Sequence, residues 1–133
     1  MVLVEYGGTR NPIAPEGETP FQRKLRMVDR GDIRQRYSDG YSNSYNALKT
    51  RFECEPERAI INQTSKMFMH LISAVIGIPI ENFVLTGDET GHVGSADILI
   101  GLDRVLRGDG ISQPYLVAGS TPYAFGSGLV LPA

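Results

Sequence analysis

The stretch of sequence that decides the fold is residues 83–106, FVLTGDETGHVGSADILIGLDRVL. Its first four residues, 83–86, are apolar or β-branched and predict a short strand. A run that holds three glycines follows and predicts a tight loop, because glycine adopts backbone angles that other residues resist. The remainder predicts an amphipathic helix, whose apolar face consists of Ile98, Leu99, Leu102, Val105 and Leu106.

His92 and Asp97 lie at the junction between this loop and this helix. The two side chains can meet if the loop folds back over the helix start, and a histidine held by a carboxylate is the base half of a nucleophilic triad. A structural explanation stands beside this one, in which Ser95 caps the helix and the helix dipole stabilises Asp97 in the first turn. His92 is then an ordinary polar loop residue. The spacing alone leaves both explanations open.

The composition is that of an ordinary globular protein. The 133 residues suffice for one domain with a modest core, and 41% of them are apolar and 21% charged. The net charge of −2 gives no electrostatic reason to expect a nucleic-acid or membrane partner. The sequence has no apolar run of about 18 residues and no basic segment before an apolar one at its start. We therefore expect neither a membrane span nor a secretory signal.

Cys54 is the single cysteine, which excludes an internal disulfide and fits a reducing compartment such as the cytoplasm. The four methionines form no metal-ligand pattern, and we expect no metal site. His70 falls off the apolar face of its predicted helix, so we interpret it as a surface residue.

The N-terminal part of the chain reads differently from the rest. Residues 2–6 predict a short strand, and the three prolines of residues 9–22 predict an extended arm that lies across another surface. The basic run at residues 23–30 is a solvated face, or else a contact for the phosphates of a carrier arm or coenzyme A. We therefore divide the chain into an N-terminal strand and arm, residues 1–31, and a domain, residues 32–133.

The domain begins with a predicted helix over residues 32–53, for which Asp32 is the candidate cap. Apolar and aromatic residues recur about every four positions along this helix, and this stripe predicts a core or interface face rather than an aromatic binding platform. Gly40 weakens the middle of this helix. The stripe consists of Ile33, Tyr37, Tyr41, Tyr45 and Leu48.

The later elements alternate between strands and helices. Residues 58–62 predict a buried strand, and the helix that follows ends at Gly77. Residues 115–118 predict another strand, and residues 125–131 follow too closely for a parallel crossover. The sequence therefore predicts an α/β fold with a mostly parallel sheet, an antiparallel last strand, and helices packed on the sheet.

Polar pairs follow three of these strands, namely Asn62-Gln63, Gly91-His92 and Gly119-Ser120. The carboxyl ends of parallel strands lie at one edge of a sheet, which is where α/β proteins bind ligands. We therefore expect the three pairs to converge on a common site.

Residues 58–131 resemble the C-terminal half of a β-ketoacyl-acyl-carrier-protein synthase III, an enzyme of the thiolase fold. Asn62-Gln63-Thr64-Ser65 stands where the family has His-Gln-Ala-Asn. Residues 91–96, GHVGSA, resemble the family's Gly-Asn-x-x-x-Ala box, and the family's Ala-Leu-Asp is matched by Gly101-Leu102-Asp103. Residues 119–130, GSTPYAFGSGLV, are similar to its glycine-rich turn and last strand. The resemblance implies a thiolase-like half.

Two departures change what this resemblance implies. Asn62 replaces the family's usual histidine, and His92 replaces its usual asparagine. Residues 91–97 instead fit the Gly-His-x-Gly-x-x-Asp box of divergent acyltransferases from polyketide and antibiotic pathways. Such a relationship implies that His92 is a general base and that Asp97 fixes its tautomer. The catalytic residues expected are His92, Asp97 and Asn62, and the substrate-binding residues expected are Gln63, Ser65, Gly119 and Ser120.

The resemblance also implies an acyltransferase (EC 2.3.1 type) in fatty acid or polyketide biosynthesis. The Cys or Ser nucleophile of the family lies in an N-terminal half that this chain lacks, and Cys54 lies at the wrong end of the sheet. We therefore expect an N-terminal half or subunit as partner, and an oligomer. The substrate is a thioester of coenzyme A or an acyl carrier protein, with no tightly bound cofactor.

Two alternatives remain open at the level of sequence. In the first alternative, the chain is a non-catalytic binding or scaffold subunit of an acyl-transferring complex, and the altered sequence boxes reflect the loss of catalytic activity. The other alternative is an unrelated small α/β domain that binds a phosphate ligand, although neither G-x-G-x-x-G nor G-x-x-x-x-G-K follows a strand here.

Overall fold

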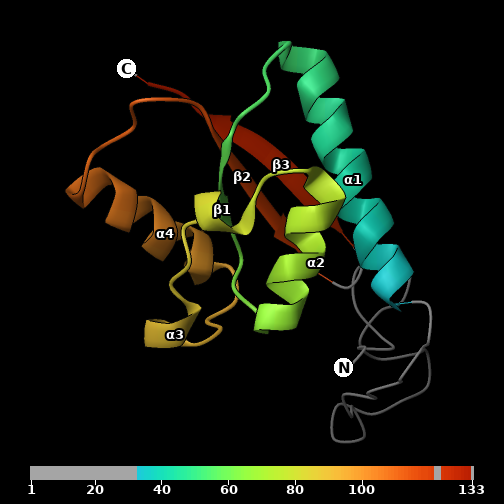
Figure 1. The fold of residues 1–133 in the computed structure, drawn as a ribbon, viewed down its shortest axis with the longest axis horizontal. Coiled ribbons are helices and arrows are strands. Elements are labelled where there is room, and N and C mark those ends of the chain that lie inside the picture. The colour runs from blue at the N-terminus through green and yellow to red at the C-terminus, as the bar shows by residue number, and fades with distance from the viewer. Residues whose placement is uncertain (1–32, 122–123, 133) are drawn as a thin grey trace, which may run out of the picture.

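The computed structural model describes residues 33–121 and 124–132 (Figure 1). The strand expected at 2–6, the arm at 9–22, the basic run at 23–30, the cap Asp32 and the boundary after residue 31 lie outside this range. Within it, strands and helices alternate along the chain.

Helix α1, Ile33–Phe52, packs against the sheet through the tyrosine stripe. Tyr41, Tyr45 and Leu48 are buried, and Tyr37 is partly buried against the same core. The stripe is therefore a core face, as its spacing predicted. Gly40 lies inside the helix, where a Cβ atom would come within 2.4 Å of the Phe125 ring. The helix approaches the sheet this closely because residue 40 has no side chain.

Strand β1, Arg58–Ile61, is buried over its last three residues and leads into helix α2, Lys66–Ile76. The Ser65 hydroxyl caps α2 by accepting a hydrogen bond from the Phe68 N–H. Gly77 ends the helix in the left-handed conformation with φ of 74°. The apolar face of α2 points into the same core as α1, with Phe68, Met69, Ile72 and Ile76 buried.

Strands β2, Tyr115–Ser120, and β3, Phe125–Val130, complete a sheet with the order β1-β2-β3. β1 and β2 are parallel, with Ala59 opposite Leu116. β3 runs antiparallel to β2, with Leu116 opposite Leu129. The predicted antiparallel last strand is therefore confirmed.

The prediction of a strand over residues 83–86 is wrong beyond its first residue. Phe83 forms an isolated parallel bridge with Ala59, after the 3-10 turn η2, Ile80–Asn82. The predicted glycine loop then begins with a short helix, α3, Gly87–Thr90. The backbone leaves the ladder because the Gln63 side chain takes over its hydrogen bonds, accepting from the N–H groups of residues 86 and 87.

Helix α4, Ala96–Arg107, forms where the sequence predicted a helix, but its buried face is different. Asp97, Gly101 and Val105 are buried, whereas Leu99 and Leu106 are 67% and 59% exposed. The helix lies on the sheet along its glycine, since a Cβ at residue 101 would come within 2.7 Å of an Ile60 methyl group. Ser95 precedes the helix without a side-chain capping hydrogen bond.

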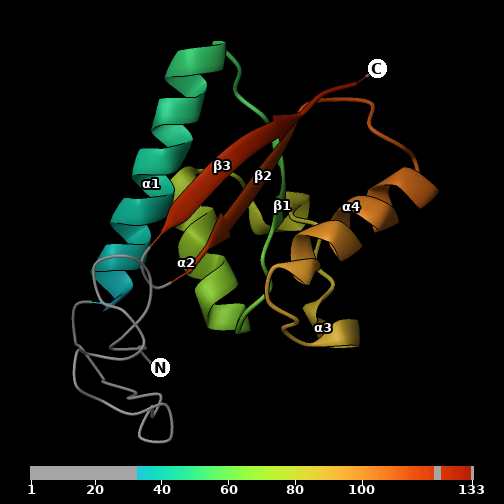
Figure 2. The ribbon, with the colours of Figure 1, turned by 180° about the vertical axis from the view of Figure 1, so that it is seen from behind.

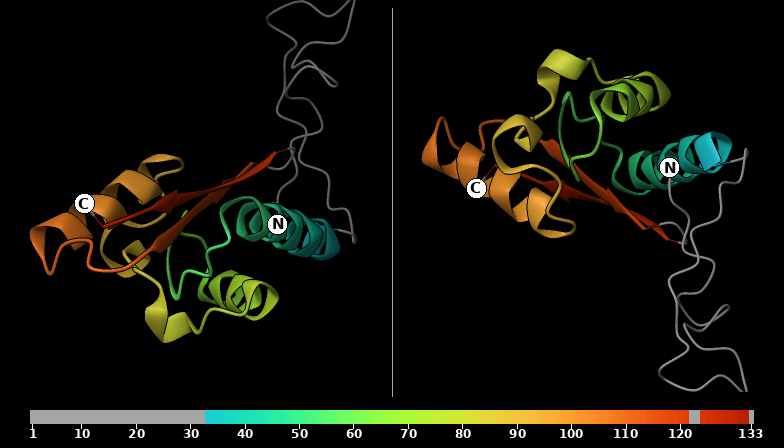
Figure 3. Two further views of the ribbon diagram at one scale, coloured as in Figure 1. Left: turned by 90° about the horizontal axis from the view of Figure 1, so that it is seen from above. Right: turned by 90° about the horizontal axis from the view of Figure 1, so that it is seen from below.

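The elements form three layers, which are seen from behind in Figure 2 and edge-on in Figure 3. Helices α1 and α2 share the larger core on one face of the sheet, and α4 packs on the other face beside Ile60 and Tyr115. This arrangement is the predicted α/β fold, a mixed sheet with helices packed on both faces. Among the described residues, no helix is both long and apolar enough to cross a membrane.

Candidate active site

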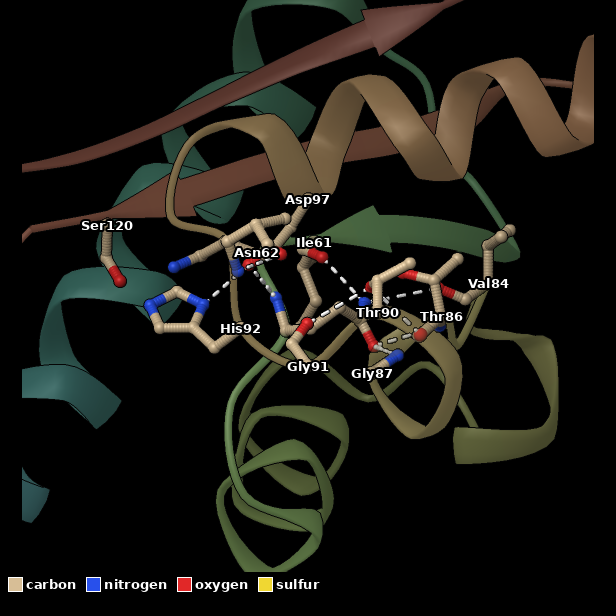
Figure 4. A network of polar contacts seen from close by, with 12 residues as sticks. Ile61, Asn62, Val84, Thr86, Gly87, Thr90, Gly91, His92, Asp97 and Ser120 are labelled. Atoms are coloured by element: carbon tan, nitrogen blue, oxygen red, sulfur yellow. Dashed lines mark hydrogen bonds and ion pairs between the residues drawn. The ribbon is translucent and has the colours of Figure 1, made fainter.

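The carboxylate of Asp97 is the fixed point of the site (Figure 4). It is fully buried in the first turn of α4. Its Oδ2 atom accepts the backbone N–H of Gln63 at 2.7 Å, and its Oδ1 atom accepts the backbone N–H of Val93 at 2.9 Å. The carboxylate thereby joins the end of β1 to the loop before α4. The carboxylate also lies at the positive end of the α4 helix dipole.

His92 completes this arrangement, with its Nδ1 atom 2.6 Å from Asp97 Oδ2. A carboxylate only accepts hydrogen bonds, so Nδ1 carries the proton in this contact, and the neutral ring has its free lone pair on Nε2. In Figure 4 the second ring nitrogen faces away from Asp97, on the side where Ser120 lies. The imidazole is 49% exposed, which leaves this nitrogen accessible to a substrate. A histidine in this state can accept a proton.

A pocket of about 560 Å³ opens beside the imidazole, at the carboxyl ends of β1 and β2. It brings together residues from the three predicted pairs, although His92 of the pair Gly91-His92 comes from the loop after α3 rather than from the end of a strand. Most of its lining is apolar, as in sites for small organic ligands. Its walls include Asn62, His92, Ile98, Gly119, Ser120 and Phe125.

Asn62 lines this pocket, and Tyr41 holds its side chain by a hydrogen bond. The Tyr41 hydroxyl donates to Asn62 Oδ1 at 2.8 Å and lies 3.1 Å from Ser120 Oγ. Burial raises the pKa of Tyr41 to about 12, so the phenol keeps its proton at neutral pH. The sequence predicted Tyr41 only as part of a core or interface face. The only sequence evidence for Tyr41 was its place in the apolar stripe, and such a stripe does not show which of its residues forms a polar contact.

Two predicted substrate-binding residues lie elsewhere. The Gln63 amide donates to the carbonyl groups of Ile61 and Val84 and accepts from the backbone of residues 86 and 87, so its hydrogen bonds hold the chain. Ser65 is exposed and caps α2. Gly119 and Ser120 do line the pocket with Asn62 and His92.

No thiol lines this pocket among the described residues, because Cys54 precedes β1 and the pocket lies at the other end of that strand. Across residues 33–121 and 124–132, no three His, Cys, Asp or Glu side chains form a cluster that could hold a metal ion. The arrangement can therefore bind and orient a ligand and accept a proton from it through His92.

The sequence of residues 54–133 matches the family model described as the C-terminal part of 3-oxoacyl-[acyl-carrier-protein] synthase III. No curated protein matches the chain. The match covers β1 and every later element, and it leaves out α1.

Solved structures of similar fold come from the same group of proteins. The 3-oxoacyl-(acyl carrier protein) synthase III of Pseudomonas aeruginosa is 16% identical, with a TM-score of 0.67 over 83% of this chain and 37% of that one. The synthase III of Thermus thermophilus is 15% identical, with a TM-score of 0.70 over 96% of this chain and 40% of that one. ChlB3, described as an acyltransferase, is 18% identical, with a TM-score of 0.67 over 86% and 39%. The chain thus spans about two fifths of each solved relative, and these likenesses establish the fold.

Proposed function

The chain belongs to the family of 3-oxoacyl-[acyl-carrier-protein] synthase III C-terminal domains, and from this premise we propose that it is the C-terminal half of an acyltransferase. In this proposal the acyl group comes from a thioester of coenzyme A or an acyl carrier protein. It passes through a Cys or Ser nucleophile that an N-terminal half supplies. The thioester is a substrate, no cofactor is tightly bound, and the enzyme acts in the cytoplasm.

The observation that carries the proposal is the contact between His92 and the buried Asp97. His92 Nε2 takes the proton of the nucleophile as that group attacks the thioester carbonyl, the carbon–sulfur bond breaks, and the proton is passed to the leaving thiolate. For the acceptor, Nε2 takes its proton as it attacks the acyl-enzyme carbonyl, the bond from the acyl carbon to the nucleophile breaks, and the proton returns to the nucleophile. Asp97 holds the ring in the tautomer that has a free Nε2 and stabilises the imidazolium that forms.

Asn62 and the backbone around Gly119 are the groups suited to the substrate carbonyl. The Asn62 amide does not titrate, so its part in the reaction is to hydrogen-bond a carbonyl oxygen or the pantetheine arm. Gly119 and Ser120 line the same pocket, and the apolar walls at Ile98 and Phe125 suit an acyl chain.

The expected partner is an N-terminal thiolase-like half, in the same polypeptide or in another. Two observations support it: the chain spans about two fifths of its solved relatives, and α4 leaves Leu99 and Leu106 exposed on its outer side. Large apolar side chains that lie exposed together on one helix are typical of a surface that another protein covers. We propose that this side of α4 packs on the N-terminal half, and that the complete enzyme is an oligomer.

The decisive experiment measures acyl transfer by the chain combined with an N-terminal half that carries a Cys or Ser nucleophile. His92→Ala and Asp97→Asn should each lower kcat by about a hundredfold or more, because both remove the positioned base. His70→Ala is the matched control, since His70 is exposed on α2 and lies outside the pocket, and it should leave kcat unchanged. Undiminished transfer by His92→Ala would show that His92 is not the base.

A binding or scaffold subunit is the second candidate, and the lack of a thiol at the described pocket favours it. A scaffold should form a stable complex with the N-terminal half and should add no acyl transfer to it. Size-exclusion chromatography detects the complex, and the acyl-transfer assay on the same fractions distinguishes the two functions.

A further inference from the structure

Tyr41 contacts two residues that line the pocket, Asn62 and Ser120, from outside the part of the chain that the family model matches. It lies on α1, whereas the family model begins at residue 54. Its side chain is 1% exposed and is held edge-on between Phe68 and Phe125, whose ring centroids lie 6.4 Å and 5.6 Å away. A phenol clamped in this way keeps its hydroxyl in one place, directly behind Asn62.

The hydroxyl joins Asn62 and Ser120 in a directed chain of hydrogen bonds. A phenol carries one proton, and that proton is donated to Asn62 Oδ1 at 2.8 Å. In the 3.1 Å contact with Ser120 Oγ, the serine must then be the donor. The direction therefore runs from Ser120 through Tyr41 to the carbonyl oxygen of Asn62.

We propose that Tyr41 is a positioning residue that fixes the Asn62 amide with its oxygen toward α1 and its Nδ2–H donors toward the pocket. Asn62 then offers a donor to the carbonyl oxygen of the acyl thioester, an assignment of the ligand that rests on the proposed function. Negative charge grows on that oxygen when the thioester is attacked, and a preorganised donor stabilises it. The reverse orientation of the amide would place an acceptor there and repel the oxygen.

The amide orientation can be measured by NMR on the isotopically labelled chain, with no substrate or partner. Tyr41→Phe should shift the Asn62 carbonyl carbon, Cγ, upfield, because its oxygen loses a hydrogen bond. Tyr45→Phe is the matched control, since Tyr45 lies one turn further on the same buried face and does not line the pocket, and it should leave Cγ unshifted. A shift of Nδ2 with Cγ unchanged would mean that the nitrogen faces Tyr41, which overturns the proposal.

Kinetics test whether this orientation matters to the reaction. In the complex with the N-terminal half, Tyr41→Phe should lower kcat roughly tenfold with little change in KM, and Tyr45→Phe should change neither. In an Asn62→Ala background Tyr41→Phe should have no further effect, because its partner is gone. An equal loss in both backgrounds would show that Tyr41 acts by another route.

The two readouts also separate this proposal from the proposed function. If the combined halves show no acyl transfer but Tyr41→Phe still shifts Cγ upfield, the acyltransferase is rejected and the orientation of Asn62 stands. The dispersion of backbone amide resonances shows whether Tyr41→Phe is folded. If it is unfolded, Ser120→Ala takes its place, because it removes the outer hydroxyl alone and should move Cγ in the same direction by less. An unmoved Cγ in folded Ser120→Ala would then overturn the chain of hydrogen bonds.

Discussion

The carboxylate of Asp97 accepts hydrogen bonds from Gln63, Val93 and His92, and two of these donors are backbone N–H groups. Backbone donors remain whatever side chains surround them, so the position of the carboxylate is set by the fold. The first helical turn adds the favourable dipole. The structural and the catalytic explanations of Asp97 are therefore compatible, because the contacts that stabilise the start of α4 also aim the carboxylate at His92.

Thr86 carries a buried hydroxyl with no hydrogen-bond partner among the described residues. Burying an unpaired hydroxyl costs free energy, and valine has nearly the same shape without it. We expect Thr86→Val to raise the free energy of unfolding by about 1 kcal/mol in urea denaturation. The comparison is Thr90→Val, which loses the hydroxyl that donates to the Thr86 carbonyl and should not stabilise the chain. Equal effects of the two variants would contradict this explanation.

Tyr41 gives stability a dependence on alkaline pH. Its pKa is raised by burial to about 12 from the ordinary value of 10, so the unfolded chain loses this proton first. The contribution is complete below about pH 10 and is lost as the pH rises to 12, for a total of about 3 kcal/mol. Urea denaturation between pH 9 and about 12 should therefore show a shallower fall in Tyr41→Phe than in the original chain. Parallel curves for the two proteins would contradict the shift.

Contacts at the residue scale were predictable when they were local in sequence. The spacing of His92 and Asp97 suggested that they meet, and they do. The contact between Tyr41 and Asn62 joins two elements, and no periodicity encodes it. Their catalytic and positioning roles stay predictions.

At the scale of the element, the packing of α1 on β3 depends on Gly40. A Cβ at this position would lie 2.4 Å from the Phe125 ring. Alanine normally favours a helix by about 1 kcal/mol over glycine, but here it must displace an aromatic ring. We expect Gly40→Ala to lower the free energy of unfolding by about 1–3 kcal/mol and to weaken the Tyr41–Asn62 contact. Denaturation measures the first effect and the Asn62 Cγ resonance the second. A stabilised variant would show that the ring yields freely.

The three long helices were predictable from apolar spacing, and α2 ends at Gly77 as predicted, whereas its cap Ser65 had been expected to bind substrate. The strand at 83–86 was not, because the Gln63 side chain from another element takes its backbone hydrogen bonds. The face of α4 was misjudged for a similar reason. Its approach along Gly101 turns Leu99 outward, and a count of apolar residues cannot register a close approach.

At the scale of the whole molecule, the site occupies one end of a half structure. The pocket lies at the carboxyl ends of β1 and β2, and the exposed leucines lie on α4, which begins beside that pocket. A partner on the outer side of α4 would therefore come close to His92. The surface proposed to dock the N-terminal half and the proposed catalytic site belong to the same region, so we expect docking and catalysis to depend on each other.

Replacing Leu99 and Leu106 together by glutamate separates docking from folding. Both side chains are largely exposed, so the double variant should change the free energy of unfolding of the chain by about 0.5 kcal/mol or less per site. Docking should suffer far more, because burying a leucine contributes about 1.5–3 kcal/mol. We expect the dissociation constant for the N-terminal half to rise by about a hundredfold or more, measured by calorimetry.

Met67→Glu is the control for this experiment, since Met67 is 66% exposed on α2, which packs on the opposite face of the sheet. It introduces one negative charge, against two in the leucine variant, on a surface that the proposed docking does not use, so the dissociation constant should stay unchanged. If the leucine variant and the Met67 variant weaken binding equally, the loss reflects added negative charge rather than a lost contact. Unweakened binding by the leucine variant would place the N-terminal half on another face of the domain, and His92 would then need a nucleophile from a different direction.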